Sequence, residues 1–280
     1  MTSIRAAWRR GRELLADSPS PAPDARLLLS HVLERDHAYL VAHDDEPLSP
    51  DALTAFDALL LRAAAGEPIP YLLGHAPFMG LEFIVSPAVL IPRPETEQLV
   101  EFALAWARGR EPLRAVDVGT GSGCIAVSLA TRLTGAVVAV DVSDAALAVA
   151  AANVARHAPG RVHLLRGDLL AALAPGFDLI TANLPYVAAD EWPTLPVGVK
   201  SYEPALALDG GRDGLDLIQS LLPQAAARLR PGGLLLLEVG WRQGKAVAEL
   251  TRAAFPGAVV AVRPDFAGHD RIVAVERQGG

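Results

Sequence analysis

The chain has 280 residues, a formal net charge of −7 at pH 7, and 51% hydrophobic residues. This length allows one large and one small domain, but the longest apolar runs, such as Leu234 to Leu237, are far too short to span a bilayer. The acidic balance argues against a protein that grips long nucleic acid, and no apolar stretch follows the N-terminal arginines, as a signal peptide would require.

Residues 1–75 are predicted to form helices only, because apolar residues recur there at helical spacing. One helix has a clear start. Ser49 is a suitable N-cap, Pro50 fits the first helical position, and Asp51 suits the positive end of the helix dipole. Prolines between the helical stretches indicate short links, so we expect a small helical bundle.

Four arginines lie close together in the first helical stretch, namely Arg5, Arg9, Arg10 and Arg12. Such a run can face a nucleic acid or a ribosomal surface, but it is more typical of a helix face exposed to solvent. We interpret it as a solvated face.

Residues 76–94 combine aromatic residues, Val and Ile with Gly80 and four prolines, which indicates a hairpin or an extended connector. Over residues 95–280, strand-like apolar runs alternate with helical stretches, a pattern typical of a mainly parallel sheet with helices on both faces. The last two runs flank a loop with Gly268 and suit a terminal hairpin. The strand-like runs span residues 115–118, 136–142, 162–165, 177–182, 234–239, 259–262 and 272–275.

The first of these strands is followed by a glycine-rich turn, Asp117-Val118-Gly119-Thr120-Gly121-Ser122-Gly123-Cys124. Its three glycines let the backbone turn tightly and approach a ligand before a helix begins. A dinucleotide-binding turn would have its third glycine or alanine at position 124, where this chain has Cys124. An acid followed by Gly-x-Gly-x-Gly fits S-adenosylmethionine better, and Asp117 can attract the ammonium group of its methionine moiety.

Acidic residues also follow the next two predicted strands. Asp141 stands at the end of the second, where a carboxylate can accept hydrogen bonds from both ribose hydroxyls. Asp168 and Leu169 follow the third and are positioned to meet the edge and face of an adenine. Because ligands of open α/β sheets bind at the carboxyl ends of the strands, we expect these residues to form one cofactor site.

Cys124 is the only cysteine, which excludes internal disulfides and fits a reducing cytosol, and we expect it to be a small buried residue. The seven histidines are scattered without the spacing of metal ligands. We therefore expect a cytoplasmic protein with no metal, no membrane contact and no stable binding of nucleic acid.

The fourth strand runs directly into Asn183-Leu184-Pro185-Tyr186. This tetrapeptide resembles the Asn-Pro-Pro-Tyr motif of methyltransferases that modify planar nitrogens, either exocyclic amines of bases or glutamine amides. An amide nitrogen is a poor nucleophile, because its lone pair is delocalised into the carbonyl group. The Asn183 side-chain oxygen and the Leu184 carbonyl can each accept one N–H of such an amide. Tyr186 can supply a flat wall, and its ordinary pKa near 10 makes it a poor base.

Three further segments accompany this motif: Ile91 to Glu97 (IPRPETE), Tyr202 to Leu208 (YEPALAL) with the glycines that follow it, and Gly268 to Arg271 (GHDR). Together with the N-terminal helices, these segments resemble the HemK family of peptide chain release factor glutamine methyltransferases. The resemblance covers the whole chain. It implies an α/β fold, with a Rossmann-like class I methyltransferase domain that has a mainly parallel seven-stranded sheet and a C-terminal antiparallel hairpin.

The resemblance also implies an activity. Members transfer a methyl group from S-adenosylmethionine to the glutamine of the Gly-Gly-Gln motif in class 1 peptide chain release factors, giving N5-methylglutamine and S-adenosyl-L-homocysteine. Residues 1–75 would recognise the release factor, 76–94 would connect, and 95–280 would form the methyltransferase domain. The cofactor contacts would match residues 119–123, Asp141, Asp168, Leu169 and Asn183, and the glutamine would bind at residues 183–186.

The chain departs from the family at one position, because Leu184 replaces the usual first proline of the motif. The backbone carbonyl survives this change, but the loop loses one φ restraint. Two other functions remain open at this point. An adenine N6-methyltransferase of nucleic acid would need a basic groove or a recognition domain, and neither is evident. A non-catalytic S-adenosylmethionine-binding partner of translation would not need Asp117, Asp141 and Asn183 together.

Overall fold

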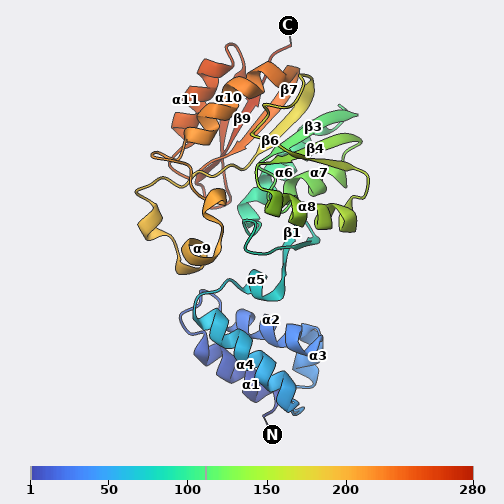
Figure 1. Cartoon of the computed structure of the whole chain (residues 1–280), viewed down its shortest axis with the longest axis vertical. Coiled ribbons are helices and arrows are strands. Elements are labelled where there is room, and N and C mark those ends of the chain that lie inside the picture. Colours follow the sequence, from blue (N-terminus) through green and yellow to red (C-terminus); the bar gives the residue numbers. More distant parts are fainter. Residues whose placement is uncertain (1, 111, 280) are drawn as a thin grey trace. The chain divides into compact units, whose positions relative to one another are not determined.

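The structure is a computed structural model that describes residues 2–110 and 112–279. The described residues form two compact units. The smaller contains the chain up to His75 together with Pro196–Tyr202, and the larger contains Ala76–Leu195 and the chain from Glu203 onward. Figure 1 shows their elements.

The smaller unit is helical. Its elements are α1 (Ile4–Leu14), α2 (Pro21–Leu33), α3 (His37–Ala42), α4 (Pro50–Ala64), α5 (Ile69–Leu73) and α9 (Val197–Tyr202). The predicted start of α4 is confirmed, since the Ser49 hydroxyl accepts the N–H of Ala52 at 3.1 Å and Pro50 is the first helical residue. Leu28, Leu29 and Phe56 are fully buried between the helices.

The larger unit is built on a seven-stranded sheet with the order β5-β4-β3-β6-β7-β9-β8. Its strands are β3 (Leu113–Val118), β4 (Gly135–Asp141), β5 (Val162–Arg166), β6 (Phe177–Ala182), β7 (Leu229–Glu238), β8 (Val259–Pro264) and β9 (Asp270–Glu276). The first five pair in parallel, and β9 runs antiparallel to both β7 and β8. The predicted α/β fold with a C-terminal antiparallel hairpin is confirmed.

Helices cover both faces of this sheet (Figure 1). One face carries α6 (Pro94–Ala107), α7 (Cys124–Ala130) and α8 (Asp144–His157), and the other carries α10 (Asp216–Arg228) and α11 (Gly244–Ala254). Neighbouring residues of one strand therefore enter different cores: Ala115 packs in the first and Val116 in the second. This explains why the strands are continuously apolar rather than alternating.

A two-stranded sheet, β1 (His75–Phe78) with β2 (Leu81–Ile84), packs against the first of these faces through the buried rings of Phe78 and Phe83. Asn153 on α8 secures it. The Asn153 Oδ1 atom accepts the N–H of Ile84 at 2.7 Å, and its Nδ2 donates to the carbonyls of Ile84 and Ser122, both at 2.9 Å. One buried carboxamide thus ties this hairpin and the glycine-rich turn to the same helix.

Replacing Asn153 by Ala should destabilise the protein by about 2–4 kcal/mol, because it removes the partner of one buried and two partly buried backbone groups. Urea denaturation measures the effect. The matched control is Gln219→Ala, which removes an exposed carboxamide from α10 and should change the free energy of unfolding by less than about 0.5 kcal/mol. Equal stability of the two variants would contradict this role of Asn153.

Candidate active site

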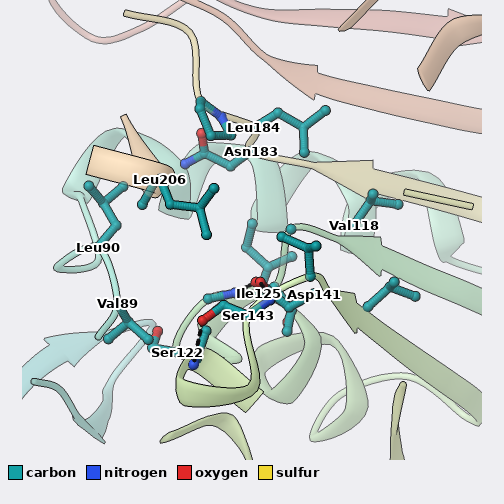
Figure 2. A pocket seen from close by; sticks show the side chains of 18 of the residues that line it. Val89, Leu90, Val118, Ser122, Ile125, Asp141, Ser143, Asn183, Leu184 and Leu206 are labelled. Atoms are coloured by element: carbon teal, nitrogen blue, oxygen red, sulfur yellow. Dashed lines mark hydrogen bonds between the residues drawn. The ribbon is translucent and has the colours of Figure 1, made fainter. Parts of the chain in front are cut away.

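A cavity of about 320 Å³ opens at the carboxyl ends of the parallel strands in the larger unit. Ten of the residues predicted for the site line it: Gly119, Thr120, Gly121, Ser122, Asp141, Asp168, Leu169, Asn183, Leu184 and Pro185. Figure 2 shows Asp141 and Ser122 at one end of the cavity and Asn183 at the other. These segments meet at one edge of the sheet, as predicted, because the parallel strands that precede them are neighbours.

Asp141 organises the glycine-rich turn. Its Oδ2 atom accepts the N–H of Gly121 at 2.8 Å, and its Oδ1 accepts the N–H of Ser143 at 2.9 Å. Each carboxylate oxygen keeps a further lone pair for a ligand hydroxyl. The turn itself needs Gly119, which has a φ of 70° and where a Cβ atom would come within 2.9 Å of the Leu184 side chain. The turn and the Asn183 loop are therefore packed against each other.

Asp117, Gly123 and Tyr186 do not line the cavity. Asp117 was predicted to attract a ligand ammonium group, but its side chain is fully buried at the end of β3. Its oxygens accept the hydroxyls of Thr120 at 2.7 Å and of Thr181 at 2.9 Å. Burial raises the pKa of Asp117 to about 7, and the two hydroxyls limit the rise. Asp117 therefore reaches the cavity only through Thr120.

Beyond β5, Asp168 is exposed at the cavity wall, whereas Leu169 is buried. Leu169 has a φ of 51°, in the left-handed region that residues with a side chain rarely adopt. The side-chain oxygen of Gln224 on α10 accepts the N–H of the next residue, Leu170, at 3.0 Å and helps to hold this turn. A strained backbone held by its surroundings is a common feature of ligand sites.

The loop after β6 is fixed from several sides. The Asn183 Nδ2 atom donates to the Thr96 hydroxyl at 3.2 Å, and the Leu184 side chain is buried. Gln243 donates from its Nε2 atom to the carbonyl of Tyr186 at 2.9 Å. Burial raises the pKa of Tyr186 to about 12, so its phenol stays protonated. Pairing with Thr96 leaves the Asn183 side-chain oxygen available to a ligand.

Two further segments of the wall were identified in the sequence only as part of the connector or of a family signature. The first contributes Ala88, Val89, Leu90, Pro92 and Arg93, and the second contributes Pro204, Leu206 and Ala207. Figure 2 labels Leu90 and Leu206 together with Asn183. The buried carboxylate of Glu203 joins these segments, because it accepts the N–H of Ile91 at 3.2 Å and forms an ion pair with Arg93. Periodicity could not reveal this pairing, since the partners lie more than 100 residues apart.

The burial of Asp117 has a consequence for stability. Its pKa rises from 3.8 to about 7 on folding, so the folded state holds this proton more tightly than the unfolded state. Its contribution to stability is complete below about pH 4 and is lost as pH rises through about 7. Asp117→Asn removes the ionisation. From pH 4.5 to pH 8, the variant should gain about 2–4 kcal/mol of stability relative to the unaltered protein. A difference in unfolding free energy that is independent of pH would contradict this assignment.

Within residues 2–110 and 112–279, no helix is long and apolar enough to cross a membrane. The same residues contain no group of three or more His, Cys, Asp or Glu side chains arranged to hold a metal ion.

Known proteins resemble this chain in sequence and fold. A family described as "PrmC N-terminal domain" matches residues 6–74, and one described as "Methyltransferase domain" matches residues 115–197. The chain is 47% identical to the release factor glutamine methyltransferase of Moorella thermoacetica, with 99% of each chain covered. It is also 47% identical to that of Cereibacter sphaeroides, with 90% of each covered. A methyltransferase structure from Pyrococcus furiosus has the same fold, with a TM-score of 0.53 at 19% identity over 80% of this chain and 98% of that one. The chain belongs to the release factor glutamine methyltransferase family.

Proposed function

We propose that this protein transfers a methyl group from S-adenosylmethionine to the side-chain amide nitrogen of the glutamine in the Gly-Gly-Gln motif of class 1 peptide chain release factors. The observation that carries the proposal is the position of Asn183 and Leu184, which line a cavity that also contains the glycine-rich turn and Asp141. Family membership supports the choice of a glutamine amide over other planar nitrogens. Because release factors act in translation, this activity belongs in the cytoplasm.

The cavity wall fits S-adenosylmethionine. Asp141 keeps free lone pairs for the ribose hydroxyls after binding Gly121 and Ser143. Asp168 and Leu169 suit the adenine, residues 119–122 suit the methionine part, and Asn183 lies where it can meet both ligands. When bound, the cofactor supplies a methyl group on a positively charged sulfur and leaves as S-adenosyl-L-homocysteine. No residue has to coordinate a metal in this scheme.

The loop after β6 binds and orients the substrate amide. The Asn183 oxygen and the Leu184 carbonyl each accept one N–H of the substrate amide and direct its nitrogen toward the methyl group. A carbon–nitrogen bond forms as the carbon–sulfur bond breaks, and positive charge builds on the nitrogen. The two fixed oxygen dipoles stabilise that charge. The methylated amide then loses one of its two protons to water, since a protonated amide nitrogen is strongly acidic. Tyr186 does not act as the base, because its phenol stays protonated.

We further propose that the helices up to His75 recognise the folded release factor. They lie in a unit separate from the cavity, and no predicted cofactor residue falls within them. The methyltransferase domain, residues 95–280, would then act on a glutamine that the helices help to present. The arginines of α1 are partly engaged already, because Arg5 pairs with Asp44 and Arg10 pairs with Asp57.

Asn183→Ala should lower kcat by about 10²–10³-fold, because it removes one of two preorganised acceptors and lets the amide rotate. Cofactor affinity should change much less, since residues 119–123 and Asp141 remain. The measurement is single-turnover methylation of a release factor followed by mass spectrometry, beside a calorimetric titration of S-adenosylmethionine. Duplex DNA is the second substrate in the assay. Methylated adenine in place of methylated glutamine, or near-normal turnover in the variant, would contradict the proposal.

A chain that begins at Ala76 should keep its affinity for S-adenosylmethionine and lose affinity for the whole release factor. The segment Pro196–Tyr202 belongs to the helical unit and loses its packing partners in this truncation, so the cofactor titration also reports whether the sheet domain still folds. A short peptide with the Gly-Gly-Gln motif serves as the control substrate. Unchanged kcat/KM for the whole release factor would give the helices another role.

A further inference from the structure

Glu238 is a buried acid that the proposed mechanism does not use. It is the last residue of β7, and only 2% of its surface is exposed. Among the described residues, its Oε2 atom has no hydrogen-bond partner. A buried carboxylate oxygen without a partner costs free energy. Such an oxygen in a folded protein therefore suggests a functional role.

Strand register brings Glu238 beside the acceptor loop, residues 183–186 after β6. Parallel β6 and β7 pair Ala182 with Leu237, so the next positions are Asn183, the first residue after β6, and Glu238, the last residue of β7. Thr96, in the first turn of α6, completes the group. Its side chain is buried, it lines the cavity, and its hydroxyl oxygen accepts the Asn183 Nδ2–H at 3.2 Å.

The hydrogen bonds of these three side chains have a defined direction. A threonine hydroxyl that accepts a bond from Asn183 still has its own hydrogen to donate, and a carboxylate can only accept. Burial raises the pKa of Glu238 to about 7, while the neighbouring side chains of Thr96, Arg271 and Asn183 work against this rise. With Glu238 as the final acceptor, the Asn183 Nδ2 atom is held toward Thr96 and its oxygen is free for substrate.

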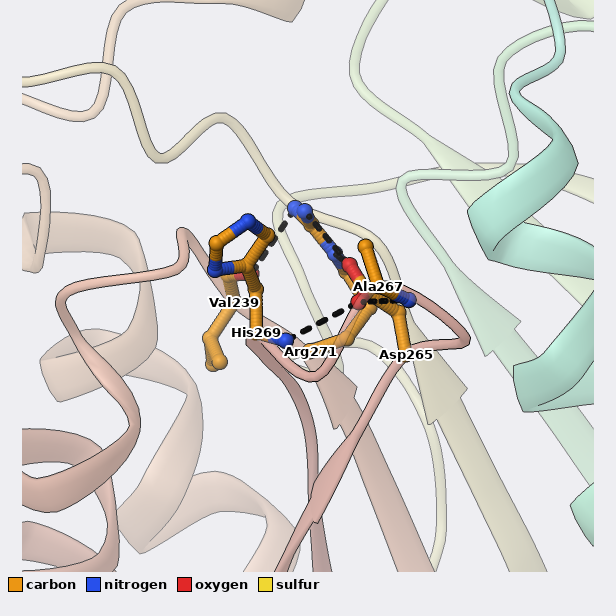
Figure 3. A network of polar contacts seen from close by, with 5 residues as sticks. All are labelled: Val239, Asp265, Ala267, His269 and Arg271. Atoms are coloured by element: carbon orange, nitrogen blue, oxygen red, sulfur yellow. Dashed lines mark hydrogen bonds and ion pairs between the residues drawn. The ribbon is translucent and has the colours of Figure 1, made fainter.

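The charge of Arg271 favours the ionised form of Glu238, but Arg271 forms its ion pair with another acid. Arg271 is bound by Asp265, with Nη2 at 3.1 Å and Nε at 3.3 Å from Oδ2 of that carboxylate. Figure 3 shows this pairing, together with the N–H groups of Ala267 and His269 that hold the other oxygen of Asp265. The Asp265 pKa lies below its usual range, first because of the His269 N–H, so this pair persists at neutral pH. Glu238 thus retains its negative charge when it ionises.

We propose that Glu238 and Thr96 are positioning residues for the methyl transfer: they fix the Asn183 carboxamide with its oxygen toward the substrate, and the Glu238 charge stabilises the positive charge that builds on the amide nitrogen. The inference rests on the proposed function. The negative charge of Glu238 then has a positive partner in the transition state, the amide nitrogen, which it lacks in the resting protein.

The role requires the ionised acid. Other charged or titratable groups around Glu238 are Arg271 on β9, Glu95 on α6, Cys124 on α7 and Tyr186 in the acceptor loop. Burial raises the pKa values of Cys124 and Tyr186 to about 12, so neither titrates near neutral pH. The kcat of the unaltered enzyme should therefore rise with pH through about 7, where Glu238 loses its proton.

The test is the pH profile of single-turnover methylation, with release factor and S-adenosylmethionine both saturating. Glu238→Gln should lower the rate by about 10- to 100-fold at pH 8.5, flatten the profile, and approach the rate of the unaltered enzyme at pH 6, where the acid is protonated. Thr96→Val should lower the rate by a similar factor. Thr96→Ser keeps the hydroxyl, so its rate should stay within about threefold of that of the unaltered enzyme. Cofactor affinity, measured by calorimetry, should be unchanged in all three variants and shows that they are folded.

The matched control is Glu276→Gln. Glu276 pairs with Leu234 at the far end of the same ladder, is half exposed, and should leave the profile unaltered. A rising limb that persists in Glu238→Gln would belong to another acid, such as Asp117, and would overturn the inference. A loss of equal size at every pH, or equal rates for Thr96→Val and Thr96→Ser, would overturn it as well. The unaltered enzyme is assayed before any variant. If it leaves the release factor unmethylated, the proposed function itself fails.

Discussion

Parallel pairing holds β6 between β3 and β7, and the register of these strands decides which side chains meet at their carboxyl ends. Val118 lies beside Ala182, and Ala182 lies beside Leu237, so all three strands end at the same level. The glycine-rich turn, the acceptor loop and Glu238 follow directly from those ends. A shift of one residue in β6 would turn the Asn183 side chain to the other face of the sheet.

Two buried acids lie near the same edge of the sheet, and burial disfavours the ionised form of each. Asp117, next to last in β3, and Glu238, last in β7, lie on two strands separated only by β6, and burial raises the pKa of each to about 7. Both acids therefore make the folded protein less stable above about pH 7 than at low pH. Asp117 is satisfied by two hydroxyls, whereas one oxygen of Glu238 has no partner among the described residues. The sheet cores on both faces, packed with large aliphatic side chains, offset this cost.

Much of this arrangement could be predicted, because Asp141 ends a strand, Asp168 and Asn183 lie just beyond strands, and parallel strands end at a common edge. The role of Asp117 could not be predicted, since one of its two hydroxyl partners, Thr181, lies on another strand. Contacts between distant loops were equally hidden. Glu203 with Arg93 bridges 110 residues, and no periodicity encodes such a pair. The packing of Pro196–Tyr202 with the N-terminal helices likewise depends on tertiary contacts alone.

In the mechanism that we propose, the Asn183 oxygen and the Leu184 carbonyl together hold the acceptor amide. A crystal structure with S-adenosyl-L-homocysteine and a Gly-Gly-Gln peptide tests it most directly. We expect the glutamine nitrogen to lie within about 3 Å of both oxygens, with Asn183 Nδ2 still on the Thr96 hydroxyl. A glutamine nitrogen that contacts neither oxygen, or an Asn183 side chain turned with its nitrogen toward the substrate, would contradict this account.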